Sequence, residues 1–238
     1  VGKTRDEFVS NVSHELKTPL SSMKILSDAI LIQEDVDTGL YKEFLQDINS
    51  EIDRMTYIIN DLLKVVKLDQ GETGLNIENI DLYKMVTDIL KRLFPIAEQK
   101  QIKIVLNEVK QKILADVDEV KMTLAISNLI ENAIKYTNPE GIVKISLEQD
   151  HMHAFISVQD SGIGISESDQ TKVFDRFYRV DKTRDRETGG TGLGLSITHS
   201  TILLHNGSIK LTSKPEEGST FLIRVPLQHS QASKTFKP

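Results

Sequence analysis

Apolar residues repeat every seven positions in two stretches of the first 70 residues of this 238-residue chain. Such a repeat is typical of long helices that pack side by side, so each stretch predicts one helix. The polar, glycine-containing segment Asp35–Gly39 separates them and predicts the turn of a helical hairpin. The repeat positions are Val9, Val12, Leu16, Met23, Leu26 and Ile30 in the first helix, and Leu45, Ile48, Ile52, Met55, Ile59, Leu62 and Val66 in the second.

Two helices with one apolar stripe each do not enclose a core. A two-fold dimer buries both stripes, because two hairpins then form a four-helix bundle. A monomeric hairpin packed on the rest of the chain is the alternative. We therefore predict an all-α helical hairpin, forming a dimeric four-helix bundle, over residues 1–70.

His14 lies outside the apolar stripe of the first predicted helix, five residues after Val9. An imidazole held outward on a rigid helix is available to receive a chemical group, whereas a buried histidine packs. Glu15 adds an adjacent carboxylate, and Thr18 adds a hydroxyl one turn further along the same face. The pair His14-Glu15 also begins the signature of zinc proteases, but Thr18 stands where that signature needs a second histidine, which excludes this class.

The pattern changes after two glycines in the segment 71–74, where we place a domain boundary. We predict a linker at 71–75, a second domain at 76–228 and a disordered polar tail at 229–238. Helices and strands mix there without strict alternation, which indicates an α+β two-layer sandwich. The expected helices are 82–100 and 119–136, capped by Asp81 and Asp118, and 193–204; the expected strands are 102–106, 142–148, 154–160, 208–213 and 220–226.

The composition excludes several kinds of partner and site. A formal net charge of -6 gives no reason to expect nucleic acid, and the absence of cysteine excludes disulfides and thiolate metal sites. No apolar run approaches the ~18 residues that a membrane span needs, and no signal peptide is present. The chain opens just before the His14 helix, so we expect the cytoplasmic portion of a longer, membrane-anchored protein whose upstream segment is missing.

The predicted helix 119–136 has two contrasting faces. Asn128, Asn132 and Lys135 share the side opposite its apolar residues. Carboxamide oxygens are hard ligands that can share a magnesium ion with phosphate oxygens, and a lysine adds a point charge for phosphate. A solvated polar face is the alternative. The apolar side carries Ile126, Leu129, Ile130 and Ala133.

Two glycine motifs follow in the second half of the chain. Asp160 ends a predicted strand and opens Asp160–Ile165, a Gly-x-Gly turn that allows close approach to the backbone. The segment Gly189–Leu195 opens a predicted helix, whose first N–H groups can face phosphate. Between them, Phe174–Arg179 and the charged stretch 180–188 predict either disorder or a lid over a nucleotide. The aromatic residues there can anchor a base or pack in the core.

These motifs occur in the order found in bacterial sensor histidine kinases, and the chain resembles that family from about Thr4 to Leu227. The resemblance implies a dimerisation and phosphoacceptor domain followed by an ATP-binding domain of the gyrase, Hsp90, histidine kinase and MutL type. It implies ATP-dependent autophosphorylation, transfer to an aspartate of a response regulator receiver domain, and a phosphatase activity toward that regulator. It implies no nucleic acid partner.

The resemblance also implies roles for individual residues. His14 is the phosphoacceptor, Glu15 the acid/base that takes its proton, and Thr18 the residue that holds water during dephosphorylation. Asn132, assisted by Asn128, binds magnesium. The implied ATP-binding residues are Asn128, Asn132, Lys135, Tyr136 at the adenine face, Asp160 at the adenine amine, Gly162, Gly164, Phe177, Arg179 at the phosphates, Gly190, Thr191, Gly192, Leu193 and Gly194.

Two other functions remain as alternatives. An ATP-hydrolysing conformational clamp, like gyrase or Hsp90, needs a glutamate base where this chain has Asn128, and a carboxamide does not act as that base. A non-catalytic dimerisation module that binds nucleotide predicts no phosphorylated protein after incubation with ATP and magnesium. The exposed imidazole favours the kinase over both.

Overall fold

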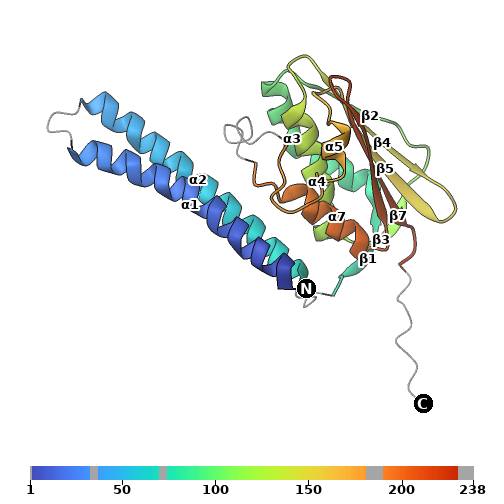
Figure 1. Ribbon diagram of the computed structural model, residues 1–238. Coiled ribbons are helices and arrows are strands. Elements are labelled where there is room, and N and C mark those ends of the chain that lie inside the picture. Colours follow the sequence, from blue (N-terminus) through green and yellow to red (C-terminus); the bar gives the residue numbers. More distant parts are fainter. Residues whose placement is uncertain (1, 33–36, 70–73, 181–189, 230–238) are drawn as a thin grey trace.

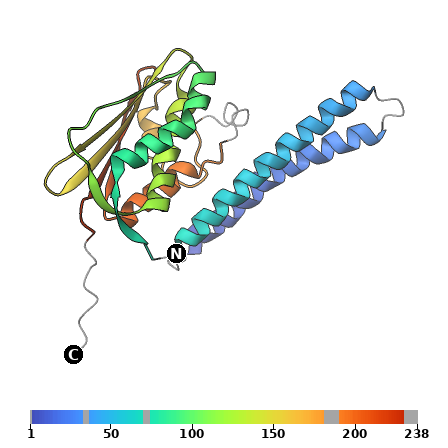
Figure 2. The same ribbon diagram turned by 180° about the vertical axis from the view of Figure 1, so that it is seen from behind.

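The chain begins with a long hairpin of two helices that lie side by side (Figure 1). The computed structural model describes residues 2–32, 37–69, 74–180 and 190–229. Helix α1 spans Gly2–Ile32 and helix α2 spans Thr38–Asp69. The predicted helical hairpin is therefore confirmed, and Figure 2 shows that it projects away from the second domain along most of its length.

The turn of the hairpin ends earlier than the sequence predicted. Residues 33–36 lie outside the described residues, and α2 already begins at Thr38, so Gly39 belongs to the helix and not to the turn. Asp37 explains the difference because its carboxylate accepts a hydrogen bond from the Gly39 N–H at 3.1 Å. Its carbonyl also accepts from the Tyr41 N–H at 3.1 Å, as expected of a helix N-cap.

The second domain is built on a five-stranded mixed sheet with the strand order β2-β4-β5-β7-β6. Strands β2 and β4 are parallel, and the other neighbours are antiparallel. The predicted strands are confirmed, with ends within two residues of those expected. The bounds are β2 Lys103–Leu106, β4 Ile142–Gln149, β5 His153–Asp160, β6 Ser208–Lys214 and β7 Gly218–Pro226.

Helices cover one face of this sheet, which makes the domain a two-layer sandwich (Figure 1). Residues along β4 and β5 alternate between buried and more exposed, as expected of a sheet with one covered face. All four predicted apolar residues on the inner side of α4 are buried in this core. The helices are α3 Leu82–Gln99, α4 Glu119–Tyr136, the short α5 Glu167–Gln170, and α7 Gly194–Leu204.

A second, two-stranded sheet was not predicted. Strand β1 (Ile77–Asp81) pairs antiparallel with β3 (Leu114–Asp118), so that Ile77 lies opposite Asp118. Both strands are short and carry acidic residues, which weakens the alternation that would reveal them in a sequence. Each strand ends in the aspartate that caps the next helix, so this small sheet fixes where α3 and α4 begin.

The two predicted capping aspartates are confirmed. Asp81 accepts hydrogen bonds from the N–H groups of Tyr83 and Lys84, and Asp118 accepts from that of Lys121 at 3.0 Å. Asp118 also accepts from the Asn76 N–H at 3.0 Å. The first residues after the predicted linker are therefore tied to the start of α4.

His229, the first residue of the predicted tail, lies within the described residues. His229 donates its backbone N–H to the Asp116 carboxylate at 3.3 Å, so it still contacts the small sheet. Residues 230–238 lie outside the described residues.

His205 is a structural residue that the sequence did not reveal. Its ring is buried between the end of α7 and the start of α4. Nε2 accepts a hydrogen bond from the Asp118 N–H at 2.9 Å, and Nδ1 lies 2.7 Å from the Thr201 carbonyl, to which it donates. This pairing requires the neutral ring, and burial lowers the pKa of His205 below its usual value.

The stability of the domain should therefore fall in mild acid. The unfolded state binds a proton at His205 near its ordinary pKa while the folded state does not, so stability is lost as the pH falls through about 6.5. A single such group contributes a loss of at most about 1.4 kcal/mol between pH 7.5 and 5.5. Urea denaturation of the wild type and His205→Gln at both pH values measures this difference. His151→Gln, at an exposed position, should follow the wild type; equal pH dependence in all three proteins would contradict the assignment.

Candidate functional site

The polar side of α4 faces the glycine-rich end of α7. Asn128, Asn132 and Lys135 are all half-buried, although the sequence alone also allowed a fully solvated face. The Asn128 side-chain NH₂ donates to the Gly194 carbonyl at 3.2 Å, which joins α4 to the first residue of α7. A carboxamide that donates through its nitrogen still accepts through its oxygen, so this residue keeps the capacity to be an oxygen ligand.

Asp160 lies at the end of β5, where its carboxylate is buried in the rim of the sheet. One oxygen accepts hydrogen bonds from the N–H groups of Gly162 at 2.9 Å and Ser219 at 3.2 Å. Desolvation raises the pKa of this carboxyl above its usual value, against the opposing effect of the two backbone donors. A buried acceptor at a strand end is suited to recognise a donor group of a ligand.

The motif after Asp160 is fixed against the end of α4. The Ile163 N–H donates to the Tyr136 carbonyl at 3.3 Å. A Cβ on Gly162 would lie 2.3 Å from the same carbonyl, so only glycine fits there. Gly164 has a φ of +67°, and a Cβ on it would lie 2.0 Å from the Lys214 carbonyl. The turn and the polar side of α4 are thus held together.

Lys135 and Tyr136 lie next to each other at the end of α4. The Lys135 ammonium is 4.9 Å from the centre of the Tyr136 ring, within the range of a cation–π contact. Both side chains are half-buried. They border the turn that begins at Asp160 because that turn is bonded to the Tyr136 backbone.

The second glycine motif enters α7 through a tight turn. Gly192 has a φ of +71°, and its carbonyl accepts a hydrogen bond from the Phe177 N–H at 2.9 Å. Leu193 is buried directly before α7 begins. Most of the predicted lid stretch, 181–188, and Gly189 lie outside the described residues. Within the described part, Phe177 and Gly192 bring the two ends of this segment together.

The aromatic residues before that segment are engaged in packing. Phe174 lies edge-on to Phe221, with ring centroids 6.2 Å apart. Phe177, a predicted ATP contact, borders an apolar cluster with Leu193, and the Tyr178 hydroxyl donates to Asp169 at 2.6 Å. Phe174 and Phe177 thus make packing contacts, and Tyr178 is held by a hydrogen bond.

The predicted phosphoacceptor patch lies on the surface of α1. His14 and Thr18 are exposed and Glu15 is half-buried. The Thr18 hydroxyl donates to the His14 carbonyl at 3.2 Å, one turn back along the helix. The imidazole is therefore accessible, as the sequence predicted.

Three contacts bring the hairpin against the second domain. An Arg179 guanidinium nitrogen lies 3.7 Å from a Glu15 carboxylate oxygen. The Thr191 hydroxyl donates to Asp61 of α2 at 2.7 Å. Val65 of α2 packs with Leu193 and Ile197 in a buried apolar cluster. Sequence reasoning missed Asp61 and Val65, because contacts between residues about 130 positions apart leave no local pattern.

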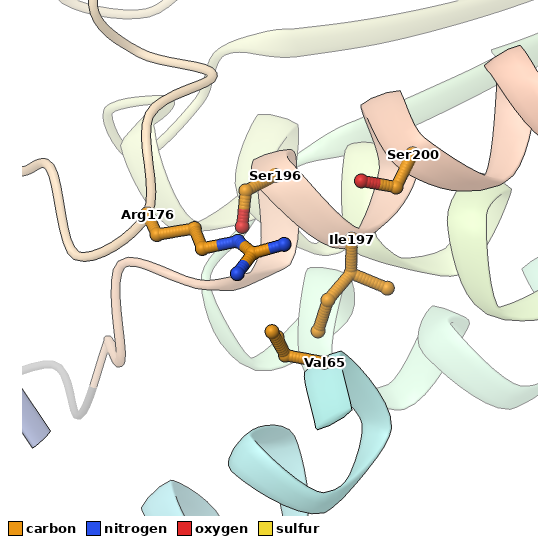
Figure 3. A pocket seen from close by; sticks show the side chains of 5 residues that line it. All are labelled: Val65, Arg176, Ser196, Ile197 and Ser200. Carbon is orange, nitrogen blue, oxygen red and sulfur yellow. The ribbon is translucent and has the colours of Figure 1, made fainter. Parts of the chain in front are cut away.

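A small pocket lies at the same interface (Figure 3). Val65 points from α2 toward Ile197 of α7, and the Arg176 side chain approaches from the loop before the second glycine motif. The other lining residues are Ser196 and Ser200. The pocket is a shallow gap between packed elements.

Two family models match the sequence. The His Kinase A (phospho-acceptor) domain matches residues 4–71, and the histidine kinase-, DNA gyrase B-, and HSP90-like ATPase domain matches residues 117–229. The chain belongs to the sensor histidine kinases. The second match assigns ATP binding to the domain that contains Asp160 and both glycine motifs.

Curated relatives agree with this assignment. The chain is 39% identical over 224 residues to the sensor-like histidine kinase SenX3 of Mycolicibacterium smegmatis, covering 94% of the chain and 58% of that protein. It is 36% identical over 229 residues to the sensor histidine kinase WalK of Bacillus subtilis, covering 95% of the chain and 37% of that protein. The chain thus spans between about a third and three fifths of these relatives.

Solved structures share the fold. The histidine kinase AdeS of Acinetobacter baumannii superposes with a TM-score of 0.71 at 24% identity, over 90% of this chain and 98% of that one. The histidine kinase ThkA, solved in complex with the response regulator protein TrrA, gives a TM-score of 0.73 at 22% identity, over 93% of this chain and 61% of that one. At these identities the likeness establishes the architecture.

Two features are absent from the part of the chain that the structure describes. None of the described helices is both long and apolar enough to cross a bilayer. No group of three or more histidine, aspartate or glutamate side chains in the described ranges is arranged to hold a metal ion.

Gly162 and Gly194, one from each glycine motif, should differ in their tolerance of alanine. Gly162→Ala places a Cβ against the Tyr136 carbonyl and should lower the free energy of unfolding by roughly 1–3 kcal/mol, as expected for overpacking. Gly194→Ala meets its nearest atom, in Asn128, at 3.7 Å and should change stability by less than about 0.5 kcal/mol. Thermal and urea denaturation measure both. Equal stability of the two variants would contradict the close approach at Gly162.

Proposed function

We propose that this chain phosphorylates His14 with ATP and passes the phosphoryl group to an aspartate of a response regulator receiver domain. The observation that carries the proposal is an exposed imidazole on a helix that is docked, within one chain, against an ATPase-type domain. Positioning and neutralisation of charge supply most of the catalysis in phosphoryl transfer. A domain that holds the donor and a helix that presents the acceptor meet the first of these needs.

The proposed nucleotide site uses the residues that surround the Asp160 turn. Asp160 would accept a hydrogen bond from the adenine amine, and Tyr136 would border the adenine face. Gly162 and Gly164 let this turn pack directly against the Tyr136 and Lys214 carbonyls, which fixes its position beside Asp160. The glycine motif 190–194 would present N–H groups at the start of α7 to phosphate, with Thr191 and Leu193 shaping its turn.

The proposed metal site consists of oxygen donors on α4. Asn132, with Asn128 beside it on the same half-buried side, would hold a magnesium ion that also binds phosphate oxygens. Such an ion neutralises charge on the phosphates when it is bound. Lys135 and Arg179 would add positive charge.

His14 would attack the γ-phosphorus of ATP through one ring nitrogen. A nitrogen–phosphorus bond forms, the bond from phosphorus to the bridging oxygen breaks, and ADP leaves. Glu15 would take the proton from the ring. When the protein acts as a phosphatase, Thr18 would hold the water that removes phosphate from the response regulator. Thr18 is exposed and lies one turn from His14.

The proposed partner of the hairpin is a second copy of this chain. Leu45, Ile52, Ile59 and Val66 form one stripe of α2, and they are between 36% and 60% exposed in a single chain. A contiguous apolar stripe on a helix is typical of a protein–protein interface. A two-fold partner would bury this stripe in a four-helix bundle.

Replacement of His14 tests the reaction. After incubation with γ-labelled ATP and magnesium, the wild type should carry acid-labile phosphate, and His14→Gln should lose essentially all of it because it lacks the nucleophile. His151→Gln, which removes an exposed histidine of the β4–β5 turn, should keep the label. Persistence of acid-labile phosphate on His14→Gln would show that the acceptor lies elsewhere.

A mixed dimer tests which chain supplies the phosphoryl group. A His14→Gln subunit still binds nucleotide, and an Asn132→Ala subunit should lose magnesium–ATP binding but keep its acceptor. Label on the Asn132→Ala subunit would indicate transfer between chains, and its absence with intact dimers would indicate transfer within one chain.

Replacement of Ile59 tests the dimer. Ile59→Asp places a charge in the exposed apolar stripe and should weaken dimerisation by at least tenfold, because a charge at a buried interface is costly. Sedimentation equilibrium measures the dissociation constant. Val120→Asp, at a 79% exposed position of the second domain, should leave it unchanged. The two-fold bundle is wrong if both variants sediment as the wild type does.

A further inference from the structure

The start of α7 is connected to a carboxylate of the hairpin through a single hydroxyl. Thr191 Oγ1 donates to Asp61 Oδ2 at 2.7 Å and accepts from the Leu193 N–H at 3.3 Å. Leu193 is the N-cap residue of α7, and its side chain supplies no capping hydrogen bond. Asp61 therefore places negative charge at the positive end of the α7 helix dipole.

An apolar contact supports this hydrogen bond from the next turn of α2. Val65 follows Asp61 by four residues, so both side chains lie on one face of the helix. Val65 is buried against Leu193 and Ile197, with Phe177 at the edge of the cluster. The polar and the apolar contact thus engage the same turn of α7, as Figure 3 shows for Val65 and Ile197.

A second acidic residue of the hairpin, Glu15, contacts the residue at the other end of the segment between Arg179 and Thr191. Arg179 comes directly before this segment. Its side chain is only 6% exposed and lies against Glu15 of α1. Both described ends of the segment between Arg179 and Thr191 therefore contact carboxylates, one from each helix of the hairpin.

These carboxylates lie where the proposed function requires phosphate. Under that proposal Arg179 and the glycine motif at Thr191 face the triphosphate, which carries several negative charges. Two anions do not share one helix N-terminus without repulsion, because the dipole there compensates only about half an elementary charge. Docking on Asp61 and binding of ATP should oppose each other.

We propose that Asp61 is a positioning residue that latches the ATP-binding domain onto the hairpin and competes with nucleotide for the Thr191 end of α7. The inference rests on the proposed function, since ATP is the competing anion. Coupling between two binding events is reciprocal. Nucleotide therefore weakens docking on Asp61 by the same factor by which docking on Asp61 weakens nucleotide binding. Asp61 would act through Thr191 and would not touch the reacting atoms.

The first test measures nucleotide affinity. Asp61→Asn keeps the shape of the side chain and removes its charge, so the dissociation constant for AMP-PNP with magnesium should fall about threefold to tenfold by calorimetry, within the usual range of coupling between sites. Asp53→Asn is the matched control, because it removes an exposed carboxylate two turns earlier on the same helix and should have no effect. An unchanged constant for Asp61→Asn would overturn the competition.

The second test measures docking without relying on nucleotide. The chain contains no cysteine, so spin labels can be placed at Tyr57→Cys on α2 and Met152→Cys in the β4–β5 turn, which are 67% and 69% exposed. Dilution with unlabelled protein restricts the measured distances to one chain. The nucleotide-free wild type should give a narrow distribution, and Asp61→Asn and Thr191→Val should broaden it. Thr191→Ser, which keeps the hydroxyl, should not.

The two tests separate the latch from the function on which it rests. Identical distance distributions in the wild type, Asp61→Asn and Thr191→Val would overturn the latch, whatever the affinity. If Asp61→Asn broadens the distribution and no protein binds AMP-PNP, the proposed function fails and the docking contact stands. A broadened distribution together with tighter binding supports the whole proposal.

Discussion

The burial of one face of α4 against the five-stranded sheet determines where the rest of the second domain lies. Ile126, Leu129, Ile130 and Ala133 occupy the core, so the residues on the opposite side of the helix turn toward the glycine motifs. Asn128 then reaches the first residue of α7, and the Tyr136 carbonyl meets the turn that follows Asp160. The packing of an apolar stripe thus sets the positions of the polar groups that we propose bind nucleotide.

Local patterns predicted the elements that depend on local physics. The heptad stripes predicted both helices of the hairpin, the aspartates at 81 and 118 predicted the starts of α3 and α4, and alternation predicted the five main strands. The small sheet was missed because its strands carry charge and pair across about 40 residues. At Asp37, a side-chain cap overrode the expectation that glycine would end the turn.

The contacts that join distant parts of the chain were beyond sequence reasoning. His205 is an ordinary histidine in the sequence, and only the fold brings Asp118 to its ring. Asp61 and Thr191 likewise meet only because α2 packs on α7. For the candidate site, the sequence identified residue types suited to each role, while the engagement of Glu15 by Arg179 required the structure.

The short connection between the two domains has a consequence for the strength of their interface. Helix α2 ends at Asp69 and Asn76 is already bonded to Asp118, so the stretch between them spans at most about 25 Å. A tether of that length keeps the two surfaces at an effective concentration in roughly the millimolar range. A short tether of this kind therefore lets an interface form within one chain that would be too weak to hold two separate proteins together.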